Sequence, residues 1–257
     1  MDKSNHELLE IAKDIAVIVG KKLRQEGHLN KNFVFDQSNI KEIKADLDTI
    51  AEKIIIDKLK VSGLSILSEE AGFIGGDLRD SRRWIIDPID GTFNYMKDLG
   101  PCAVSIGLWD KDSPVFGVIF ALNTGDLYWG GKEFGAFCNL GAISVSNIAD
   151  VAISSVCTGF PVRLDMESQE TAENFWHSIS KFSKVRMIGS ASMSLVYVAK
   201  GSSDVYLEDE IMIWDVAAGL AIVEGAGGVI SIDLGTVNNA LRVSASNERL
   251  SHDAVWK

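Results

Sequence analysis

The sequence predicts an α/β protein of the α+β layered type. Helical periodicity and short β-prone runs alternate along the 257 residues, and three β-prone runs follow one another in the middle of the chain. No stretch is rich enough in Pro, Gly or Ser to act as a linker. We therefore expect one unit, 1–257, divisible at most into two packed halves at 1–145 and 146–257.

The individual elements follow from the spacing of apolar residues. A helix should begin at Ser4, because Ser4 and Glu7 form a capping-box pattern and Leu8, Ile11 and Ile15 then share one face. Helical spacing places the helices at 4–27, 48–59, 192–200 and 216–224. The β-prone runs predict strands at 66–67, 84–86, 103–109, 115–120, 127–129, 204–207, 229–232 and 241–244. The glycines at 72, 75 and 76 predict a loop.

Composition disfavours several classes of protein. The net charge of −11 and the isoelectric point of about 4.8 argue against nucleic-acid binding, which needs clustered Lys and Arg. Cys102, Cys138 and Cys157 are odd in number and lack metal-ligand spacing, which favours free thiols in a reducing compartment and disfavours a zinc site. Acidic residues interrupt the start of the chain where a signal peptide would be basic and then apolar, and no segment reaches the roughly 20 apolar residues of a membrane helix. We expect a cytoplasmic protein that binds neither membranes nor nucleic acids.

The stretch 84–92 is the strongest candidate for chemistry. A β-prone run ends at Asp87, Pro88 restricts the backbone there, and Asp90 follows three residues after Asp87. Two carboxylates brought together in this way suit Mg²⁺, which prefers hard oxygen ligands. A helix starting near Thr92 would add free amides that attract an anion. Taken alone, the same residues also fit an ordinary acidic turn.

Three more acidic positions stand at predicted element boundaries. Asp48 opens a helix, Glu69 follows a strand, and Asp215 comes just before another helix. Each has a simpler explanation, since Asp48 and Asp215 could be helix caps and the neighbours Glu69 and Glu70 could be a solvated pair. An acidic protein that binds phosphate through these positions would need metal ions to do so.

Together these segments resemble the inositol monophosphatase family of Mg²⁺-dependent, lithium-sensitive phosphatases, and the likeness runs in order over most of the chain. The matching segments are 67–70, 84–92, 103–108, 158–161, 189–192, 214–219 and 224–228. Two departures occur within them: Ser68 stands where the family usually has Gly, and Ser192 where it often has Ala. Lys97 and Asp98 also replace a segment that often contains aromatic residues.

The resemblance implies a fold in which layers of helices alternate with two β-sheets, and a site for two or three Mg²⁺ ions in a homodimeric enzyme. Its metal ligands would be the side chains of Glu69, Asp87, Asp90 and Asp215 and the backbone carbonyl of Ile89. Its catalytic residues would be Glu69, Thr92 and Asp48, with Thr92 paired to Asp48. Its substrate contacts would be Asp90, Gly91, Thr92, Ala191, Glu208 and Asp215, of which Gly91 and Thr92 hold phosphate through their amides and Glu208 reads the alcohol portion.

The implied activity is hydrolysis of a phosphate monoester, and an inositol-1-monophosphatase is favoured, which releases myo-inositol and phosphate when a metal-activated water attacks phosphorus. The residues at 93–95, Phe-Asn-Tyr, look like the inositol-type version of this turn. Three alternatives within the family stay open: a 3'(2'),5'-bisphosphate nucleotidase, a fructose-1,6-bisphosphatase and a histidinol-phosphate phosphatase. A non-catalytic regulatory or binding protein is disfavoured because every expected ligand is present. Lys41 and Lys44 fit solvated charges better than a metal-site loop.

Overall fold

The structure is a computed structural model that describes residues 3–26, 33–35, 43–75, 82–160, 163, 165 and 167–250. The side chains of 26, 33–35 and 43–47 are outside this description. Pro161 and Lys41, which the sequence analysis considered, lie outside the described residues, as does the side chain of Lys44.

Six helices and fifteen strands are found in the described part of the chain. The helices are α1 (Asn5–Glu26), α2 (Asp46–Leu59), α3 (Thr92–Lys97), α4 (Gln169–Ser180), α5 (Ala191–Ala199) and α6 (Ile213–Gly225). The strands of the first half are β1 (Phe33–Phe35), β2 (Ile43–Ala45), β3 (Ser65–Ser68), β4 (Gly72–Ile74), β5 (Arg82–Asp90), β6 (Ala103–Asp110), β7 (Ser113–Ala121), β8 (Leu127–Gly131), β9 (Gly135–Cys138) and β10 (Gly141–Ala142). The strands of the second half are β11 (Ser155–Cys157), β12 (Lys184–Arg186), β13 (Val205–Met212), β14 (Gly228–Leu234) and β15 (Ala240–Asn247).

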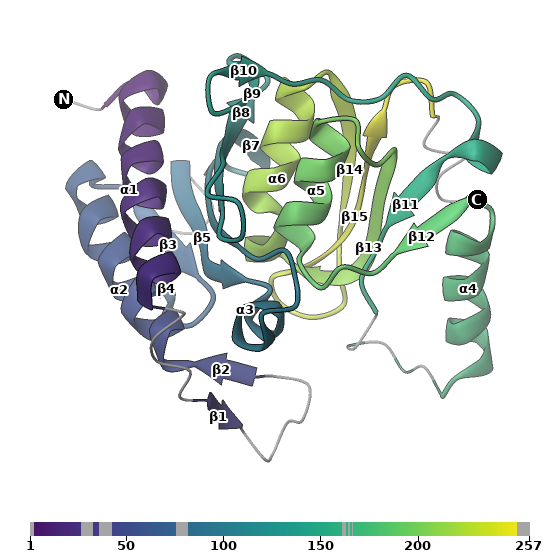
Figure 1. Cartoon of the computed structure of the whole chain (residues 1–257), viewed down its shortest axis with the longest axis horizontal. Coiled ribbons are helices and arrows are strands. Elements are labelled where there is room, and N and C mark those ends of the chain that lie inside the picture. Colours follow the sequence, from purple (N-terminus) through teal and green to yellow (C-terminus); the bar gives the residue numbers. More distant parts are fainter. Residues whose placement is uncertain are drawn as a thin grey trace.

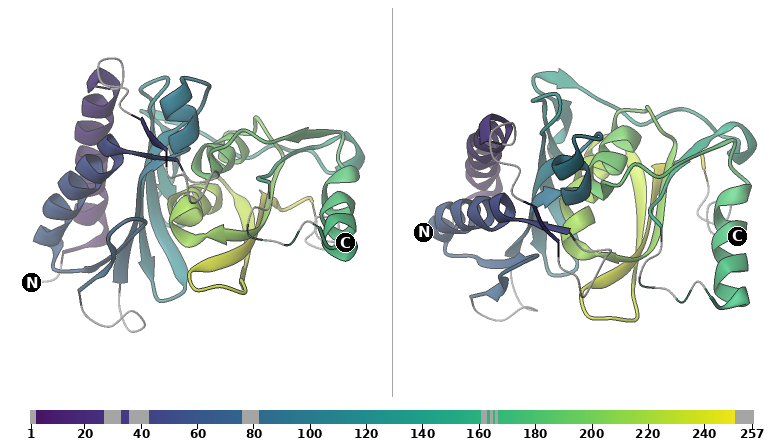
Figure 2. Two further views of the ribbon diagram at one scale, coloured as in Figure 1. Left: turned by 90° about the horizontal axis from the view of Figure 1, so that it is seen from below. Right: turned by 60° about the horizontal axis from the view of Figure 1, so that its bottom comes forward.

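These elements stack in layers (Figures 1 and 2). Helices α1 and α2 cover one face of an eight-stranded sheet, and α5 and α6 lie between its other face and a five-stranded sheet. Helix α4 lies on the far side of the five-stranded sheet. The predicted fold class, helical layers alternating with two sheets, is confirmed, and β1 and β2 add a small two-stranded hairpin.

The eight-stranded sheet has the order β10-β9-β8-β7-β6-β5-β3-β4, and only the β3–β5 pair within it is parallel. Residues alternate between its two faces, as expected for strands. Trp84 and Ile86 of β5 pack against α1 and α2, whereas Ile85 packs on the side of α5 and α6. Asp87 continues the alternation of Ile85, which directs its carboxylate toward the two central helices.

Helix α1 begins as its sequence predicts. The backbone N–H of Ser4 donates to Glu7 Oε2 at 2.8 Å, and the N–H of Glu7 donates back to Ser4 Oγ at 3.3 Å. This reciprocal pairing is a capping box. The three cysteines are free, as predicted.

Helix α6 lies close against the eight-stranded sheet because glycines form the surface beneath it. A Cβ atom on Gly117 would lie 2.0 Å from the carbonyl oxygen of Ala218, and one on Gly107 would lie 3.1 Å from the backbone of Ala217. Trp109 then reaches up from the same face, and its Nε1–H donates to the carbonyl oxygen of Ala217 at 3.1 Å. These contacts set the distance between the eight-stranded sheet and α6 at Ala217 and Ala218.

The second sheet has the order β12-β11-β13-β15-β14 and packs its inner face against α5 and α6. A β-bulge interrupts β13 between Glu208 and Ile211, where Glu210 adopts a φ of 56°. The Glu210 carboxylate accepts hydrogen bonds from the backbone N–H and the hydroxyl of Thr236, at 2.7 and 3.1 Å. These bonds hold the bulge that lies between Glu208 and the start of α6.

Several predicted boundaries are wrong. Strand β5 does not end at Asp87 but continues to Asp90, and the glycine-rich loop after β3 contains β4. Asp48 and Asp215 are not helix caps, since α2 begins at Asp46 and α6 at Ile213. Seven further elements were not predicted from the sequence, namely α4, β1, β2, β9, β10, β11 and β12.

Candidate active site

A β-bulge in β5 brings Asp87 and Asp90 onto one face of the sheet. In a regular strand, residues three apart point to opposite faces. Here Asp87 pairs with Ser105 and Asp90 pairs with Ala103, so β5 has one more residue than β6 over this interval. The N–H of Ile89 donates to Asp87 Oδ1 at 3.0 Å within the bulge. Both carboxylates consequently face α5 and α6.

The first turn of α5 holds the Asp90 side chain. The hydroxyl of Ser190 and the N–H of Ser192, the latter at 3.0 Å, donate to Asp90 Oδ2, and the N–H of Ala191 donates to Oδ1 at 3.3 Å. These bonds join a strand of the first sheet to a helix of the central layer. Ala191, predicted to contact substrate, thus lies beside Asp90.

Asp215 completes a group of three carboxylates with Asp87 and Asp90. One oxygen from each residue lies within 4.8 Å of the others. Burial raises the pKa of Asp90 to about 6, while burial and neighbouring carboxylates, Glu69 among them, raise the pKa values of Asp87 and Asp215 well above the usual range. The charged forms are disfavoured here, and a cation would reverse that preference.

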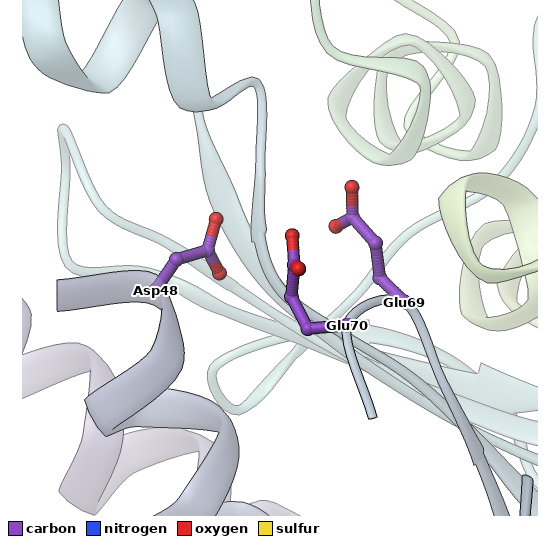
Figure 3. Close-up of side chains that lie close together, drawn as sticks. All are labelled: Asp48, Glu69 and Glu70. Carbon is purple, nitrogen blue, oxygen red and sulfur yellow. The ribbon is translucent and has the colours of Figure 1, made fainter. Parts of the chain in front are cut away.

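Asp48, Glu69 and Glu70 form a second group, whose carboxylate oxygens also lie within 4.8 Å of one another. Figure 3 shows Asp48 approaching from α2 and the two glutamates from the turn after β3. Burial, Glu69 and Glu70 raise the pKa of Asp48 well above its usual range. Charge repulsion from Glu69 also raises the pKa values of Asp87 and Asp215. The Glu69 carboxylate therefore interacts electrostatically with both groups.

Glu52 holds the turn that presents the two glutamates. Its carboxylate is buried, and Oε1 accepts hydrogen bonds from the Ser68 hydroxyl and from the N–H groups of Glu70 and Ala71, the last two at 3.1 and 2.9 Å. Ser68, which departs from the usual glycine of the family, therefore makes a bond that glycine could not make.

Thr92 connects Asp48 to the backbone of Ile89 through its hydroxyl. Its Oγ1 lies 3.2 Å from Asp48 Oδ2 and 2.9 Å from the carbonyl oxygen of Ile89, so its one proton is shared between two acceptors. Gly91 precedes it with a φ of 82°, and a Cβ at this position would lie 2.9 Å from the carbonyl oxygen of Gly189. Only glycine fits both the left-handed backbone and this close approach.

Glu208 lies at the edge of the acidic region. The hydroxyl of Tyr206 donates to Glu208 Oε2 at 2.8 Å, and burial raises the pKa of Glu208 to about 7. Charge repulsion from Asp90 contributes to that rise, so the Glu208 carboxylate interacts electrostatically with the Asp87–Asp90–Asp215 group. The residues that line a small pocket with it are Thr158, Gly159, Phe175, Ser178, Leu207 and Asp209.

The donor set suits hard divalent cations. All six side chains of the two groups offer carboxylate oxygens, the ligands that Mg²⁺ prefers. Asp48 is 4% exposed, yet its Oδ1 has no hydrogen-bond partner among the described residues. A buried carboxylate oxygen without a partner is costly unless a cation or a water satisfies it. The residues present therefore fit a metal centre.

The structure thus brings together the predicted residues Asp48, Glu69 and Thr92 on one side and Asp87, Asp90 and Asp215 on the other. The sequence prediction gave no role in the site to Glu52, whose spacing only supported the match of Asp48, or to Glu70, which belonged to a matching segment and could also form a solvated pair with Glu69. The four-residue spacing of Asp48 and Glu52 on one helix was a usable signal, since residues four apart share a helical face. No local signal placed Glu70 beside Asp48.

Comparison with known proteins agrees with this arrangement. Residues 4–256 match the model of the inositol monophosphatase family. The chain is 34% identical over 210 residues to the Nus factor SuhB of Xylella fastidiosa, covering 81% of this chain and 75% of that protein. It is 30% identical over 249 residues to the fructose-1,6-bisphosphatase/inositol-1-monophosphatase of Aquifex aeolicus, covering 96% and 93%.

A solved structure gives the same result. The crystal structure of the extragenic suppressor protein SuhB from Bartonella henselae superimposes with a TM-score of 0.82 at 29% identity, over 95% of both chains. No helix in the described part of the chain is long and apolar enough to span a membrane. Because the family model spans nearly the whole chain, this protein belongs to the inositol monophosphatase family and is a hydrolase of phosphoric monoesters.

Proposed function

We propose that the chain is a Mg²⁺-dependent phosphatase whose main substrate is inositol 1-phosphate, from which it releases myo-inositol and phosphate. The supporting observation is the convergence of two carboxylate groups, Asp48–Glu69–Glu70 and Asp87–Asp90–Asp215, with Glu69 acting on both. Two or three cations would be held by these side chains and by the carbonyl oxygen of Ile89. When bound, Mg²⁺ neutralises the phosphate dianion, lowers the pKa of water and stabilises the leaving oxygen.

The protein's own residues would orient the reactants. The Thr92 hydroxyl lies between Asp48 and the Ile89 carbonyl, where it can position the attacking water. Asp48 would accept the proton of that water, while the Thr92 hydroxyl holds its carboxylate in place through the hydrogen bond to Oδ2. The amides of Gly91 and Thr92 would bind phosphate oxygens at the start of α3.

The polyol preference rests on Glu208. Its carboxylate would accept hydrogen bonds from substrate hydroxyls, while Tyr206 holds its other oxygen. The small pocket beside it would enclose part of the alcohol. A ring with several hydroxyl groups suits this acceptor better than an apolar alcohol.

The first test is phosphate release from a panel of inositol 1-phosphate, fructose 1,6-bisphosphate, 3'-phosphoadenosine 5'-phosphate and histidinol phosphate. Each assay would be run with Mg²⁺, with a chelator, and with Mg²⁺ plus Li⁺. We expect Mg²⁺-dependent release that is fastest with inositol 1-phosphate and is inhibited by Li⁺. Release that persists in chelator would contradict the metal mechanism, and absence of release from every ester would favour a regulatory role.

Fructose-1,6-bisphosphatase activity is the second candidate. The Aquifex aeolicus relative, which is aligned over almost the entire chain, carries both activities in its name. In the same panel, faster release from fructose 1,6-bisphosphate would keep the proposed mechanism and change the main substrate.

We also propose that the enzyme is a cytoplasmic homodimer, as expected for this family. Trp176 on α4 is 65% exposed and Phe160 is 53% exposed, so both are available for a subunit contact. The molecular mass in solution by light scattering tests the dimer, and a mass near the 28.0 kDa of one chain would contradict it.

A further inference from the structure

Ser192 is a buried residue that the proposed chemistry does not yet use. It is the second residue of α5 and is 0% exposed. Its N–H donates to Asp90 Oδ2 at 3.0 Å, and its hydroxyl donates to the backbone carbonyl oxygen of Asp215 at 2.9 Å. Ser192 therefore bonds to two of the three residues whose carboxylates form the Asp87–Asp90–Asp215 group.

The bond to Asp215 is additional to those that helix α6 needs. A carbonyl in the first turn of a helix accepts the N–H four residues later, and its oxygen keeps a second lone pair. The Ser192 hydroxyl uses that second lone pair, so it connects α5 to α6 instead of completing α6. The contact requires close helices, and Gly219 provides this, since a Cβ there would lie 2.6 Å from the Cβ of Leu195.

Asp90 is held at the same turn of α5. The hydroxyl of Ser190 shares Asp90 Oδ2 with the N–H of Ser192, and Ala191 donates to Oδ1. One helical turn thus binds Asp90 through its side chain and Asp215 through its backbone. The two residues come from β5 and α6, and this turn of α5 connects them in addition to the packing of α6 on the sheet and the Trp109–Ala217 hydrogen bond.

We propose that Ser192 is a positioning residue that sets the separation of Asp90 and Asp215 and thereby the affinity of this carboxylate group for Mg²⁺. The inference rests on the proposed metal dependence. The three carboxylates repel one another, and a tie between α5 and α6 resists their spreading. Groups that orient metal ligands typically change metal affinity by about 10- to 100-fold. Ser192 acts through the backbone of one ligand, so we expect a change of about tenfold.

The test compares two alanine variants of the same helix. Ser192→Ala removes the hydroxyl and keeps the N–H that bonds to Asp90. Ser194→Ala is the matched control, because Ser194 is also buried and its hydroxyl donates to the carbonyl of Ser190 at 2.7 Å, within the same helix. Thermal unfolding during a Mg²⁺ titration gives the Tm without metal and the Mg²⁺ concentration at half-maximal stabilisation. Hydrolysis at limiting and at saturating Mg²⁺ is the second readout.

We expect both variants to lower the Tm without metal to a similar degree, while only Ser192→Ala raises the Mg²⁺ midpoint, by about tenfold. Its activity should return to nearly the wild-type value at saturating Mg²⁺. Equal midpoints in the two variants, or a loss of activity that excess Mg²⁺ does not restore, would overturn the role of Ser192. A wild-type protein that shows no Mg²⁺-dependent rise in Tm would overturn the metal-dependent function and this inference together.

Discussion

Asp90→Asn should separate metal binding from folding. Asparagine has nearly the same volume as aspartate and removes the charge. Asp90 is 5% exposed, and burial raises its pKa from 3.8 to about 6. The difference of about 2.2 corresponds to on the order of 3 kcal/mol by which the fold disfavours the charged form, at about 1.36 kcal/mol for each pKa unit. That cost disappears in the variant.

Loss of the Asp90 carboxylate as a hydrogen-bond acceptor lowers the stability of the variant. Asp90 Oδ2 accepts from the Ser190 hydroxyl and the Ser192 N–H. With an amide nitrogen in that place, the hydroxyl can rotate to accept, but the N–H loses its partner at a cost of about 1–3 kcal/mol. The two effects nearly offset, so the Tm of the metal-free variant should stay within about 5 °C of wild type.

Metal binding and turnover should both be lost. A bound metal supplies several kcal/mol of transition-state stabilisation, so kcat should fall by at least about a thousandfold. The assay is thermal unfolding with and without Mg²⁺, together with phosphate release. Asp126→Asn is the control, because Asp126 is a partly exposed carboxylate that lies outside both acidic groups and the pocket and accepts a hydrogen bond from Asn139 Nδ2 at 2.9 Å. Most of the activity surviving in Asp90→Asn, with a normal Mg²⁺-dependent rise in Tm, would refute the assignment.

Three further predictions follow from the same contacts. In chelator, the free energy of unfolding should decrease as pH rises from about 4 to 7, since the raised pKa values of Asp90 (about 6) and Glu208 (about 7) mean that the folded protein must release protons that the unfolded chain has already lost. Urea unfolding across pH measures this, Mg²⁺ should flatten the dependence, and a free energy that rises with pH would contradict it. Glu52→Ala should lower the free energy of urea unfolding by about 2–4 kcal/mol, because three donors lose their shared acceptor, and an unchanged value would show that the turn is held in another way. Glu208→Gln should raise the KM for inositol 1-phosphate by about tenfold with little change in kcat, and Tyr206→Phe should do the same more weakly; steady-state kinetics would count against this role if kcat fell instead.

The positions of Glu69, Asp87 and Asp215 could be predicted because each follows an apolar run, and that of Asp48 because it stands at the start of an expected helix. The way Asp87 and Asp90 meet could not, since their spacing fits a turn as well as it fits a strand. The two carboxylates share a face because β5 pairs with β6 through a bulge. Between its pairs with Ser105 and Ala103, β5 contains one residue more than β6. Such pairing is a long-range property that the local pattern does not contain.

Glu70 and α4 were missed for different reasons. Strand alternation would direct adjacent residues apart, but Glu69 and Glu70 lie in the turn between β3 and β4, where alternation no longer applies. Helix α4 carried a signal that was not used, because Phe175, Trp176 and Ile179 recur at helical spacing behind the cap residue Ser168. Ser192, by contrast, was noticed as a departure from the family pattern, and its significance required the distance to Asp215.

The glycines beneath α6 give residues without any polar atom in their side chains an influence on cation binding. Gly107 and Gly117 decide how near the helix backbone comes to the sheet, and Asp87 belongs to the sheet while Asp215 belongs to the helix. A single methyl group added to this surface would lift one carboxylate away from the other without altering either. Substitutions in the packing between sheet and helix can therefore change which cation is bound. A sequence comparison restricted to the carboxylates would not detect such a change.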